Sequence, residues 1–437
     1  MKIIKGRILQ FVGNPFEVPI EKSVKVYEGG SLLIKGKFIA EIDYYSVLKK
    51  KYPDAYVYDY KDKLITAGFI DCHMHYPQTG IIASYGERLL DWLNKYTFPE
   101  ELRFKNYDYA QNVASLTLDL CIKNGTTTAS SFCTTSIESV NAFFNEAKKR
   151  KMLVVGGRTC MDRNAREDLL DTPKSSYDES EKLIKQWHDK DRIVYAISPR
   201  FAPTSSPEQL EALGHLWSKY PDCLMQTHLA EQPEEIKWVK QLYPDSTDYL
   251  NVYEKFGLVG KKSLFGHSIY LSEREIDCLR ETGSSLAHCP TSNMFIGSGI
   301  FQLLKLASNN INIGLATDTG GGSSFSMIKT MSAAYEIAQL NGQSIHPAQL
   351  FWLATLGSSL SLNLDDKIGN LDVGKYADLV VINLSSTDVI NQRRIRADNI
   401  WEELFPTIIM GDDRAIEETW ISGSPVNISN QQNYNLK

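Results

Sequence analysis

The sequence predicts an α/β protein: a (β/α)8 TIM-type barrel with a small β-sandwich module built from both chain ends. Three observations support this. Eight short apolar runs alternate with helical patterns in the middle of the chain, β-rich segments stand at both ends, and metal-binding side chains follow several of the eight runs. The chain has 437 residues. That is beyond the ~250–300 at which a single core usually stops growing, so one large and one smaller domain are expected.

Composition narrows the possible function classes. Lys and Arg number 47 against 53 Asp and Glu, a net charge of -6, which argues against nucleic-acid binding because duplex affinity needs clustered cations. No apolar stretch approaches the ~18–20 residues of a membrane span, and the first residues lack the apolar core of a secretory signal. The 7 cysteines form no C-x-x-C pair. We therefore expect reduced thiols and a cytoplasmic protein without membrane or nucleic-acid partners.

The chain ends carry the smaller module. Residues 24–28 alternate apolar and polar side chains and lead into Gly29-Gly30, for which we expect a turn, and further strands are predicted at 31–34, 38–42 and 56–60. Similar β segments return late, at 379–382 and 418–421. We therefore predict a composite β-sandwich domain from residues 1–66 and 367–437, with a metal-binding catalytic barrel at 67–366 between them. Residues 428–437 are polar and are expected to fray.

Eight strand candidates, each followed by a helical pattern, predict the barrel. They are residues 67–73, 126–132, 153–158, 193–198, 223–228, 263–268, 284–288 and 311–317. Several helices have start signals: Ser206 with Pro207 and Gln209, and the predicted capping boxes 272–275 and 135–138. Residues 79–105 form a long insertion after the first strand, which we expect to combine a packing helix with a loop that covers the barrel mouth.

Metal-competent side chains end four of these strands. His73 and His75 stand two residues apart on the first strand, so they project to one face. His228 ends the fifth strand, His267 the sixth, and Asp318 the eighth. In a closed barrel all strands are parallel, so these ends meet at the face where barrel enzymes carry out chemistry. Any one of these residues alone would be structural, but five at four strand ends predict a metal site.

The motifs around these residues resemble the amidohydrolase superfamily and, within it, the guanine deaminases. The resemblance covers nearly the whole chain. It rests on Asp71–His75 with Gln78, 93–100, Ser198–Thr204, Thr227–Glu231, Gly266-His267, His288–Asn293, Ala316–Gly322 and Gly411–Arg414. It implies one zinc ion per chain, hydrolysis of guanine to xanthine and ammonia in purine catabolism, and a homodimer. The enzyme would be a hydrolase acting on a C–N bond of a cyclic amidine.

The predicted metal ligands are His73, His75, His228 and Asp318. This set is rich in nitrogen and oxygen and has no thiolate, which suits Zn²⁺ with an open position for water. Asp318 can also accept the proton of that water. His267 is expected to hydrogen-bond the water or the tetrahedral centre, and so to touch the substrate, rather than to be a primary ligand.

Glu231 is the predicted proton shuttle. It lies three residues after His228, so on an unbroken strand it would point away from that histidine. The chain must therefore turn at Leu229-Ala230 if Glu231 is to protonate the ring nitrogen beside C2 and then the departing amine. The alternative is a carboxylate that only favours the start of the next helix. The resemblance favours the catalytic role.

Three further side chains are predicted to bind the base. Arg200 can donate to an edge carrying O6 and N7, as arginine does to guanine in DNA. Phe201 offers a ring for stacking, and the Gln78 amide can read ring nitrogens. Arg200 could instead be an ion pair at the barrel rim. His288 is expected to lie behind the metal ligands or beside the substrate.

Other functions remain open at this point. Another amidohydrolase deaminase, acting on an aminotriazine, pterin or adenosine-type substrate, would share the metal ligands. A scaffold relative that has lost its metal would lack ligands, and none is missing. A binuclear relative would carry a lysine at the end of the fourth strand, where this chain has Ser198-Pro199-Arg200. One metal is therefore favoured.

Overall fold

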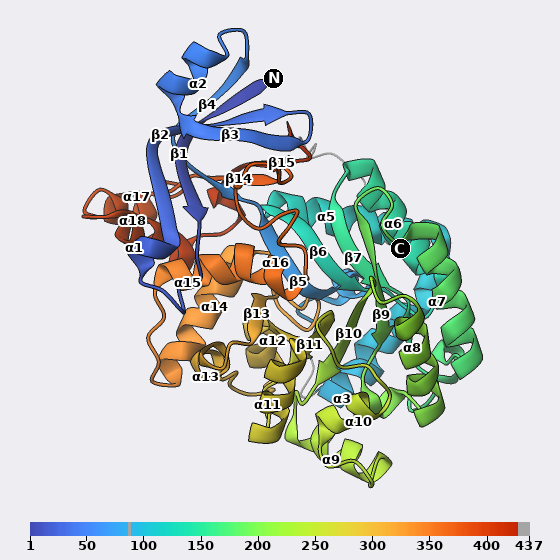
Figure 1. Ribbon diagram of the computed structural model, residues 1–437. Coiled ribbons are helices and arrows are strands. Elements are labelled where there is room, and N and C mark those ends of the chain that lie inside the picture. Colours follow the sequence, from blue (N-terminus) through green and yellow to red (C-terminus); the bar gives the residue numbers. More distant parts are fainter. Residues whose placement is uncertain (86–88, 427–437) are drawn as a thin grey trace. The chain divides into compact units, whose positions relative to one another are not determined.

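The computed structural model describes residues 1–85 and 89–426, which form two sheets and the helices around them (Figure 1). The contacts divide the chain into two compact units. Of the described residues, one unit contains 1–71, 119–128 and 325–426, and the other contains 72–118 and 129–324. The predicted domain boundaries at 66 and 367 stay a prediction. The expectation for residues 428–437 falls outside the described residues.

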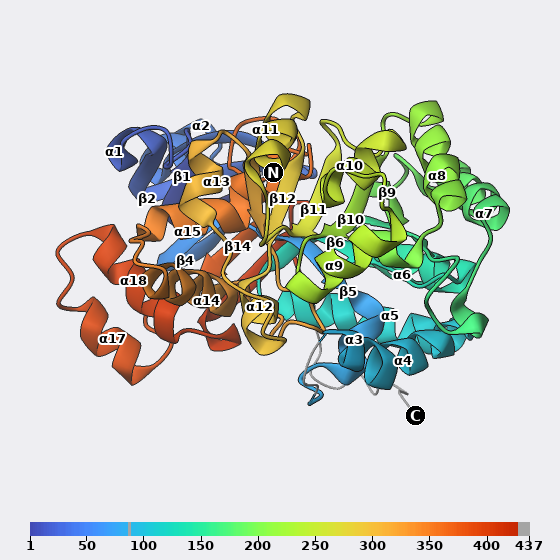
Figure 2. The ribbon, with the colours of Figure 1, turned by 90° about the horizontal axis from the view of Figure 1, so that it is seen from below.

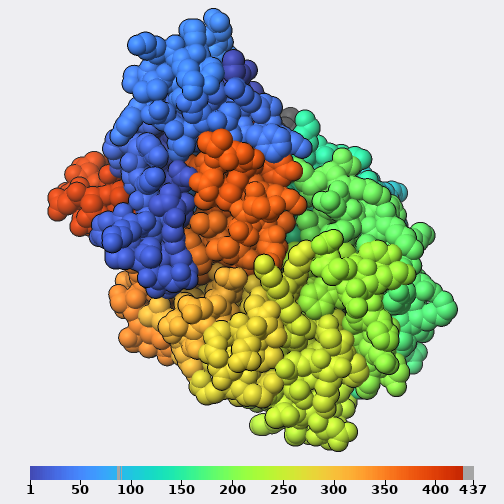
Figure 3. Space-filling view, viewed as in Figure 1, coloured from blue at the N-terminus to red at the C-terminus, as the bar shows by residue number. Residues whose placement is uncertain are grey.

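A seven-stranded sheet contains strands from both ends of the chain, as predicted for the smaller module. Its order is β16-β15-β14-β4-β1-β2-β3, in which β4 pairs with β14 from the late segment. Figure 3 shows the blue N-terminal residues directly against the orange late residues of this unit. The strands are β1 (Lys2–Phe11), β2 (Val24–Lys35), β3 (Phe38–Tyr44), β4 (Tyr56–Ala67), β14 (Leu379–Ile382), β15 (Ile416–Ile421) and β16 (Ser424–Pro425).

The turn predicted at Gly29-Gly30 is wrong, because β2 runs straight through both glycines. Between its pairings Gly6 with Gly30 and Ile8 with Tyr27, β2 uses one more residue than β1. This is a β-bulge, and Gly29 supports it with a φ of 67°, a conformation that glycine adopts without steric cost. A glycine pair can therefore mark an irregularity inside a strand as well as a turn.

The second sheet is the predicted barrel. Its strands follow the order β13-β12-β11-β10-β9-β7-β6-β5, and the short β8 (Thr159–Cys160) pairs with β9. The last and first strands meet where the N–H of Asp318 donates to the carbonyl of His73 and the N–H of His75 donates to the carbonyl of Thr319. The strands are β5 (Phe69–His75), β6 (Thr126–Phe132), β7 (Leu153–Gly157), β9 (Ile193–Pro199), β10 (Leu224–Leu229), β11 (Ser263–His267), β12 (Ser285–His288) and β13 (Asn312–Leu315). Each coincides with a predicted strand to within a few residues.

Helix starts were predicted correctly in two places and shifted by one residue in a third. Ser206 caps α8 (Pro207–Lys219), and Ser272 with Glu275 forms a capping box at α11 (Glu273–Thr282). The predicted box beginning at Thr135 is wrong. Ser136 caps α6 (Ile137–Arg150) instead, because its extended backbone lets its Oγ accept the N–H of Glu138.

The other helices connect and cover the two sheets, and α6, α7 and α8 lie outside the strands of the barrel (Figure 2). They are α1 (Ile20–Ser23), α2 (Tyr45–Lys51), α3 (Leu89–Trp92), α4 (Phe98–Leu102), α5 (Tyr107–Lys123), α7 (Pro173–Trp187), α9 (Pro233–Leu242), α10 (Tyr249–Lys255), α12 (Pro290–Phe295), α13 (Leu303–Ser308), α14 (Met327–Leu340), α15 (Pro347–Trp352), α16 (Ser358–Ser361), α17 (Asp388–Arg394) and α18 (Ile400–Met410). Among the described residues, no helix combines the length and apolar character needed to cross a bilayer. All seven cysteines are outside disulfides.

The insertion contains α3 and α4, joined by a π-helical turn at Leu93–Thr97. Leu89, Trp92, Leu93 and Phe98 pack with Phe201 and neighbouring apolar side chains in one buried cluster. The described part of residues 79–105 therefore packs against the rim of the barrel, as expected of its helix. Residues 86–88 of the insertion lie outside the described residues.

Candidate active site

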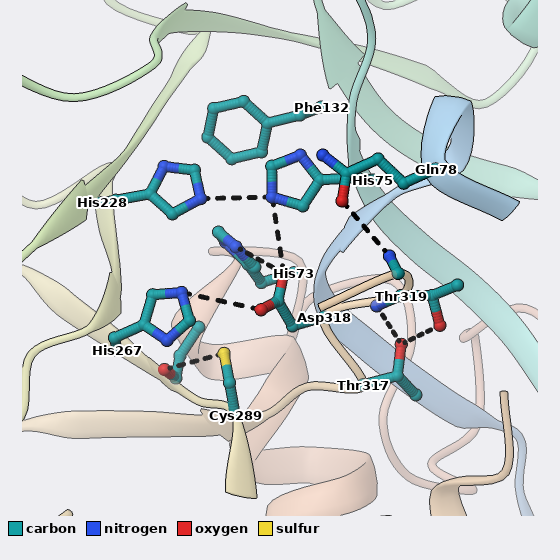
Figure 4. A network of polar contacts seen from close by, with 12 residues as sticks. His73, His75, Gln78, Phe132, His228, His267, Cys289, Thr317, Asp318 and Thr319 are labelled. Atoms are coloured by element: carbon teal, nitrogen blue, oxygen red, sulfur yellow. Dashed lines mark hydrogen bonds and ion pairs between the residues drawn. The ribbon is translucent and has the colours of Figure 1, made fainter. Parts of the chain in front are cut away.

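Five buried side chains converge at the carboxyl ends of the barrel strands (Figure 4). His73 and His75 project from the end of β5, and His228 and His267 come from β10 and β11. Asp318 follows β13 and faces them, because its backbone is paired with that of His73. The structure thus brings together the residues that the sequence placed at four strand ends.

The distances between these side chains fit one bound zinc ion. The Nε2 atoms of His75 and His228 are 3.1 Å apart, and Asp318 Oδ1 lies 3.4 Å from Nε2 of both His73 and His75. Atoms that each lie ~2.0–2.1 Å from one zinc ion stand roughly 2.9–3.4 Å from one another. The three histidines also form a group whose ligand atoms all lie within 4.8 Å. The donor set and its spacing therefore fit the predicted metal.

His75 and His228 are held in the neutral form that binds metal. Burial and the neighbouring His73 keep the pKa of His75 well below its usual range, and burial does the same for the pKa of His228. His228 Nδ1 lies 2.6 Å from the carbonyl oxygen of Arg200, so this nitrogen carries the proton and donates it. The lone pair of Nε2 then points into the site, as a metal ligand requires.

His267 stands beside the group rather than inside it. Its Nε2 lies 3.7 Å from Asp318 Oδ2 and 3.6 Å from Glu231 Oε2, and its Nδ1 is 2.9 Å from Asn293 Oδ1. Burial alone would lower the pKa of His267, but the carboxylates of Glu231 and Asp318 raise it. Although burial opposes ionisation, contacts with His73 and His267 lower the pKa of Asp318 to about 2. His267 can therefore donate a hydrogen bond toward a group held between these carboxylates.

Glu231 reaches the site because the chain turns after β10. Ala230 has a φ of 48°, in the left-handed region that non-glycine residues rarely adopt. The chain therefore changes direction at this residue. Ser298 Oγ donates to Glu231 Oε1 at 2.6 Å, and the Glu231 N–H donates to Glu235. Burial raises the pKa of Glu231. The turn that the proton-shuttle role required at Leu229-Ala230 is present.

A pocket opens over these groups. Gln78, Arg200 and Phe201 line it together with Glu231 and Asp318. Trp92, Leu89 and Leu93 of the insertion line it as well, as do His75, His228, His267, Ile296 and Gly321. Apolar walls with a few convergent polar groups are typical of a site for a small, flat molecule.

Four supporting residues were missed by the sequence reasoning. Phe132, at the end of β6, stacks on His75 with ring centroids 4.9 Å apart. Ser298 and Asn293 bond Glu231 and His267, and Glu101 bonds both Arg200 and Gln78. Asn293 ends the motif His288–Asn293 and Glu101 directly follows the run 93–100, but in all four cases only the position in the fold identifies the role. Arg200 therefore makes the ion pair considered as an alternative and also lines the pocket.

Cys289 and His288 lie deeper. Cys289 forms a second group of possible ligands with His73, His267 and Asp318, and its Sγ lies 3.5 Å from the carbonyl oxygen of Ala287. His288 stacks on Phe301 with ring centroids 4.4 Å apart and is not among the side chains that line the pocket. Its predicted place behind the ligands or beside the substrate stays a prediction.

Comparison with known proteins gives a consistent picture. A family model described as the amidohydrolase family matches residues 64–426. A guanine deaminase of Escherichia coli (strain K12) is 43% identical over 97% of this chain and 97% of its own length.

Two solved structures superpose closely. The structure of E. coli guanine deaminase has a TM-score of 0.96 and 42% identity, covering 98% of this chain and 100% of that one. A guanine deaminase from C. acetobutylicum, with guanine bound in its active site, has a TM-score of 0.87 and 30% identity, covering 98% of this chain and 100% of that one. On these findings, this chain belongs to the amidohydrolase family.

Proposed function

We propose that this chain catalyses the zinc-dependent hydrolytic deamination of guanine to xanthine and ammonia. The observation that carries the proposal is that one pocket is lined by metal-competent histidines, Asp318 and Glu231 together with Arg200 and Gln78. Relatives named guanine deaminase, similar over nearly their whole length, support the same substrate. The product would enter purine catabolism.

In this proposal His73, His75, His228 and Asp318 hold one zinc ion. Zinc, when bound, would lower the pKa of the attacking water and place positive charge near the water oxygen that is added to C2. Asp318 accepts a proton from this water through the carboxylate oxygen that faces His267. His267, with its raised pKa, donates a hydrogen bond to the oxygen as charge develops on it.

Glu231 moves the second proton. Its raised pKa lets the carboxyl group give a proton to N3, the ring nitrogen beside C2, when the C–O bond forms. The hydroxyl group now on C2 then gives its proton to the Glu231 carboxylate, which passes it to the amine, so that the C2–N bond breaks, the C2 carbonyl forms and ammonia leaves. The proton held by Asp318 returns to Glu231 and restores both groups. Arg200 and Gln78 hold the base by its edges while Phe201 packs on its face, so that C2 lies over the metal ligands.

The decisive experiment measures ammonia release from guanine by the zinc-loaded protein beside Glu231→Gln. We expect the variant to lose at least ~10²–10⁴-fold in kcat, because glutamine cannot transfer a proton. Its zinc content should stay unchanged, since Glu231 is not among the proposed ligands. Wild-type protein that binds zinc but releases no ammonia from guanine would contradict the proposal.

Another aminated heterocycle is the alternative substrate. Aminotriazine and adenosine-type substrates need the same ligands but lack the carbonyl oxygen that corresponds to O6 of guanine. Pterin offers a similar pair of a carbonyl oxygen and a ring nitrogen, but on a wider bicyclic ring. Guanine is favoured because both side chains line the pocket. We also propose a cytoplasmic homodimer, as the family resemblance implies, and light scattering of the purified protein measures its mass.

A further inference from the structure

The insertion carries a buried carboxylate that the proposed reaction does not use. Glu101 lies on α4, and its side chain is 1% exposed. Both of its oxygens accept hydrogen bonds from Arg200 Nη1, at 3.0 and 2.9 Å. Its Oε1 also accepts from Gln78 Nε2 at 3.2 Å. One side chain of the insertion therefore contacts both polar residues proposed to bind the base.

These contacts fix which atoms of Arg200 remain for a ligand. Nη1 is occupied by Glu101, and Phe98 of the same helix lies 5.6 Å from the guanidinium carbon. Among the described residues, no side chain accepts a hydrogen bond from Nη2 or Nε of Arg200. This edge of a planar fork presents two parallel donors, the arrangement that matches O6 and N7 of a purine.

Glu101 also fixes the orientation of the Gln78 amide. The NH₂ group of Gln78 points to Glu101, and its Oε1 accepts the N–H of Gly320 at 3.4 Å. Rotating the amide by 180° would place its oxygen against the Glu101 carboxylate, which is repulsive. The donor and acceptor that Gln78 can offer to a ring are therefore set by Glu101 on one side and by the loop after β13 on the other.

Charge gives a second reason for this contact. Arg200 and Glu101 are both buried, and an unpaired buried charge is costly. The pocket also contains the carboxylates of Glu231 and Asp318, which the proposed reaction uses. Pairing with Glu101 neutralises the charge of Arg200 without drawing on either of them.

We propose that Glu101 is a positioning residue that sets the purine specificity of the pocket by orienting Arg200 and Gln78 toward the O6 and N7 edge. The insertion thereby acts as part of the recognition apparatus as well as a cover. This inference rests on the proposed guanine substrate, because O6 and N7 are the atoms that it assigns to Arg200.

The test compares Glu101→Gln with Glu100→Gln, a matched control on the same helix. Glu100 is also buried, but its hydrogen bonds go to Tyr109 and Arg103 instead of Arg200 and Gln78. Two unreactive ligands separate the contributions: hypoxanthine carries O6, and purine lacks it. Inhibition constants for both are measured beside KM and kcat for guanine, and thermal unfolding monitors folding.

We expect Glu101→Gln to raise KM for guanine and the inhibition constant of hypoxanthine roughly 10- to 100-fold, the loss of one bidentate contact. The inhibition constant of purine, which keeps N7 but lacks O6, should rise by a smaller factor. In an Arg200→Ala background the same substitution should raise KM by a smaller factor than in the wild-type protein, because most of its effect passes through Arg200. Glu100→Gln should behave like wild type.

Equal weakening of purine and hypoxanthine, or full additivity with Arg200→Ala, would overturn the inference. If Glu101→Gln does not fold, Glu101→Asp keeps the charge but withdraws the carboxylate by one methylene, and the same selective loss of hypoxanthine is expected. If the wild type does not deaminate guanine, the proposed function fails by itself. Calorimetric binding of the two unreactive ligands then still tests the positioning.

Discussion

At the scale of single residues, the site depends on groups that are held in one protonation state. His75 and His228 are kept neutral by burial, and Asp318 is kept ionised by its histidine neighbours. Glu231 is shifted the other way, because burial favours its protonated form. Two carboxylates in one pocket thus have their pKa values pushed apart, which is the usual means of dividing acid and base roles.

Ser298 should tune the pH dependence of the reaction. Its hydroxyl donates to Glu231 and so stabilises the carboxylate form. In Ser298→Ala the pKa of Glu231 should rise further, and the alkaline limb of kcat/KM against pH should move to higher pH, because the reaction starts from protonated Glu231. The exposed Ser308 gives a control, because its hydroxyl bonds only the Lys305 carbonyl of its own helix. An unchanged alkaline limb in Ser298→Ala would show that Glu231 does not set it.

His288 should make folding stability depend on pH. Burial lowers its pKa to about 3 in the folded protein, against ~6.5 in an unfolded chain. The contribution of neutral His288 to the free energy of unfolding is therefore complete above pH ~6.5. It is lost as the pH falls toward 3, because the unfolded chain binds the proton at a higher pH than the folded protein does. Between pH 8 and pH 5 this amounts to roughly 2 kcal/mol.

The variant His288→Phe, which keeps a ring against Phe301, isolates this contribution. Protonation of the proposed metal ligands also lowers the free energy of unfolding at acidic pH, but it affects the wild-type protein and the variant alike. We expect the difference in unfolding free energy between pH 8 and pH 5 to be smaller in the variant. Parallel stability curves would mean that the pKa of His288 is the same in the folded and the unfolded protein.

At the scale of elements, the helix start signals have local effects that can be measured. Ser272 and Glu275 form a complete capping box at α11, with the Ser272 Oγ accepting the Glu275 N–H at 3.3 Å. Ser272→Ala should lower the free energy of unfolding by about 1 kcal/mol, since it leaves a helix donor without its partner. Urea denaturation should show a lower midpoint at unchanged slope. Ser308→Ala again serves as the control.

The insertion shows how much an element depends on the rest of the fold. Its apolar spacing predicts a helix, and α3 and α4 are present. The side to which Trp92 and Glu101 point could not be predicted, because a short helix gains a fixed orientation only when it packs against the rest of the fold. Glu101 gains its importance only when Arg200, 99 residues later, is folded beside it.

At the scale of the whole molecule, metal binding should link activity to stability. The proposed ligands come from β5, β10 and the segment after β13, so a bound ion would cross-link strands far apart in the sequence. Removing metal with a chelator should abolish deamination and lower the melting temperature, and added zinc should restore both. Metal analysis should give one zinc per chain. Two zincs per chain, or activity in the metal-free protein, would refute a mononuclear site.

The sequence by itself determined the order of the barrel strands, the family, and the metal-competent residues at four strand ends. These are local properties, because strand periodicity and short motifs are written in neighbouring residues. The turn after His228 followed from a single geometric argument about Glu231. Expectations failed where local signals are ambiguous: Gly29-Gly30 became a bulge, and Ser136 rather than Thr135 became a cap.

Only the tertiary structure decided which side chains complete the site. Phe132, Asn293, Ser298 and Glu101 contact residues that are distant in sequence or that face them only after folding. No periodicity or spacing marks such residues, since their role depends on distances between elements. The physical reason is that local patterns determine where strands and helices form, whereas the closing of the barrel determines which of their ends meet.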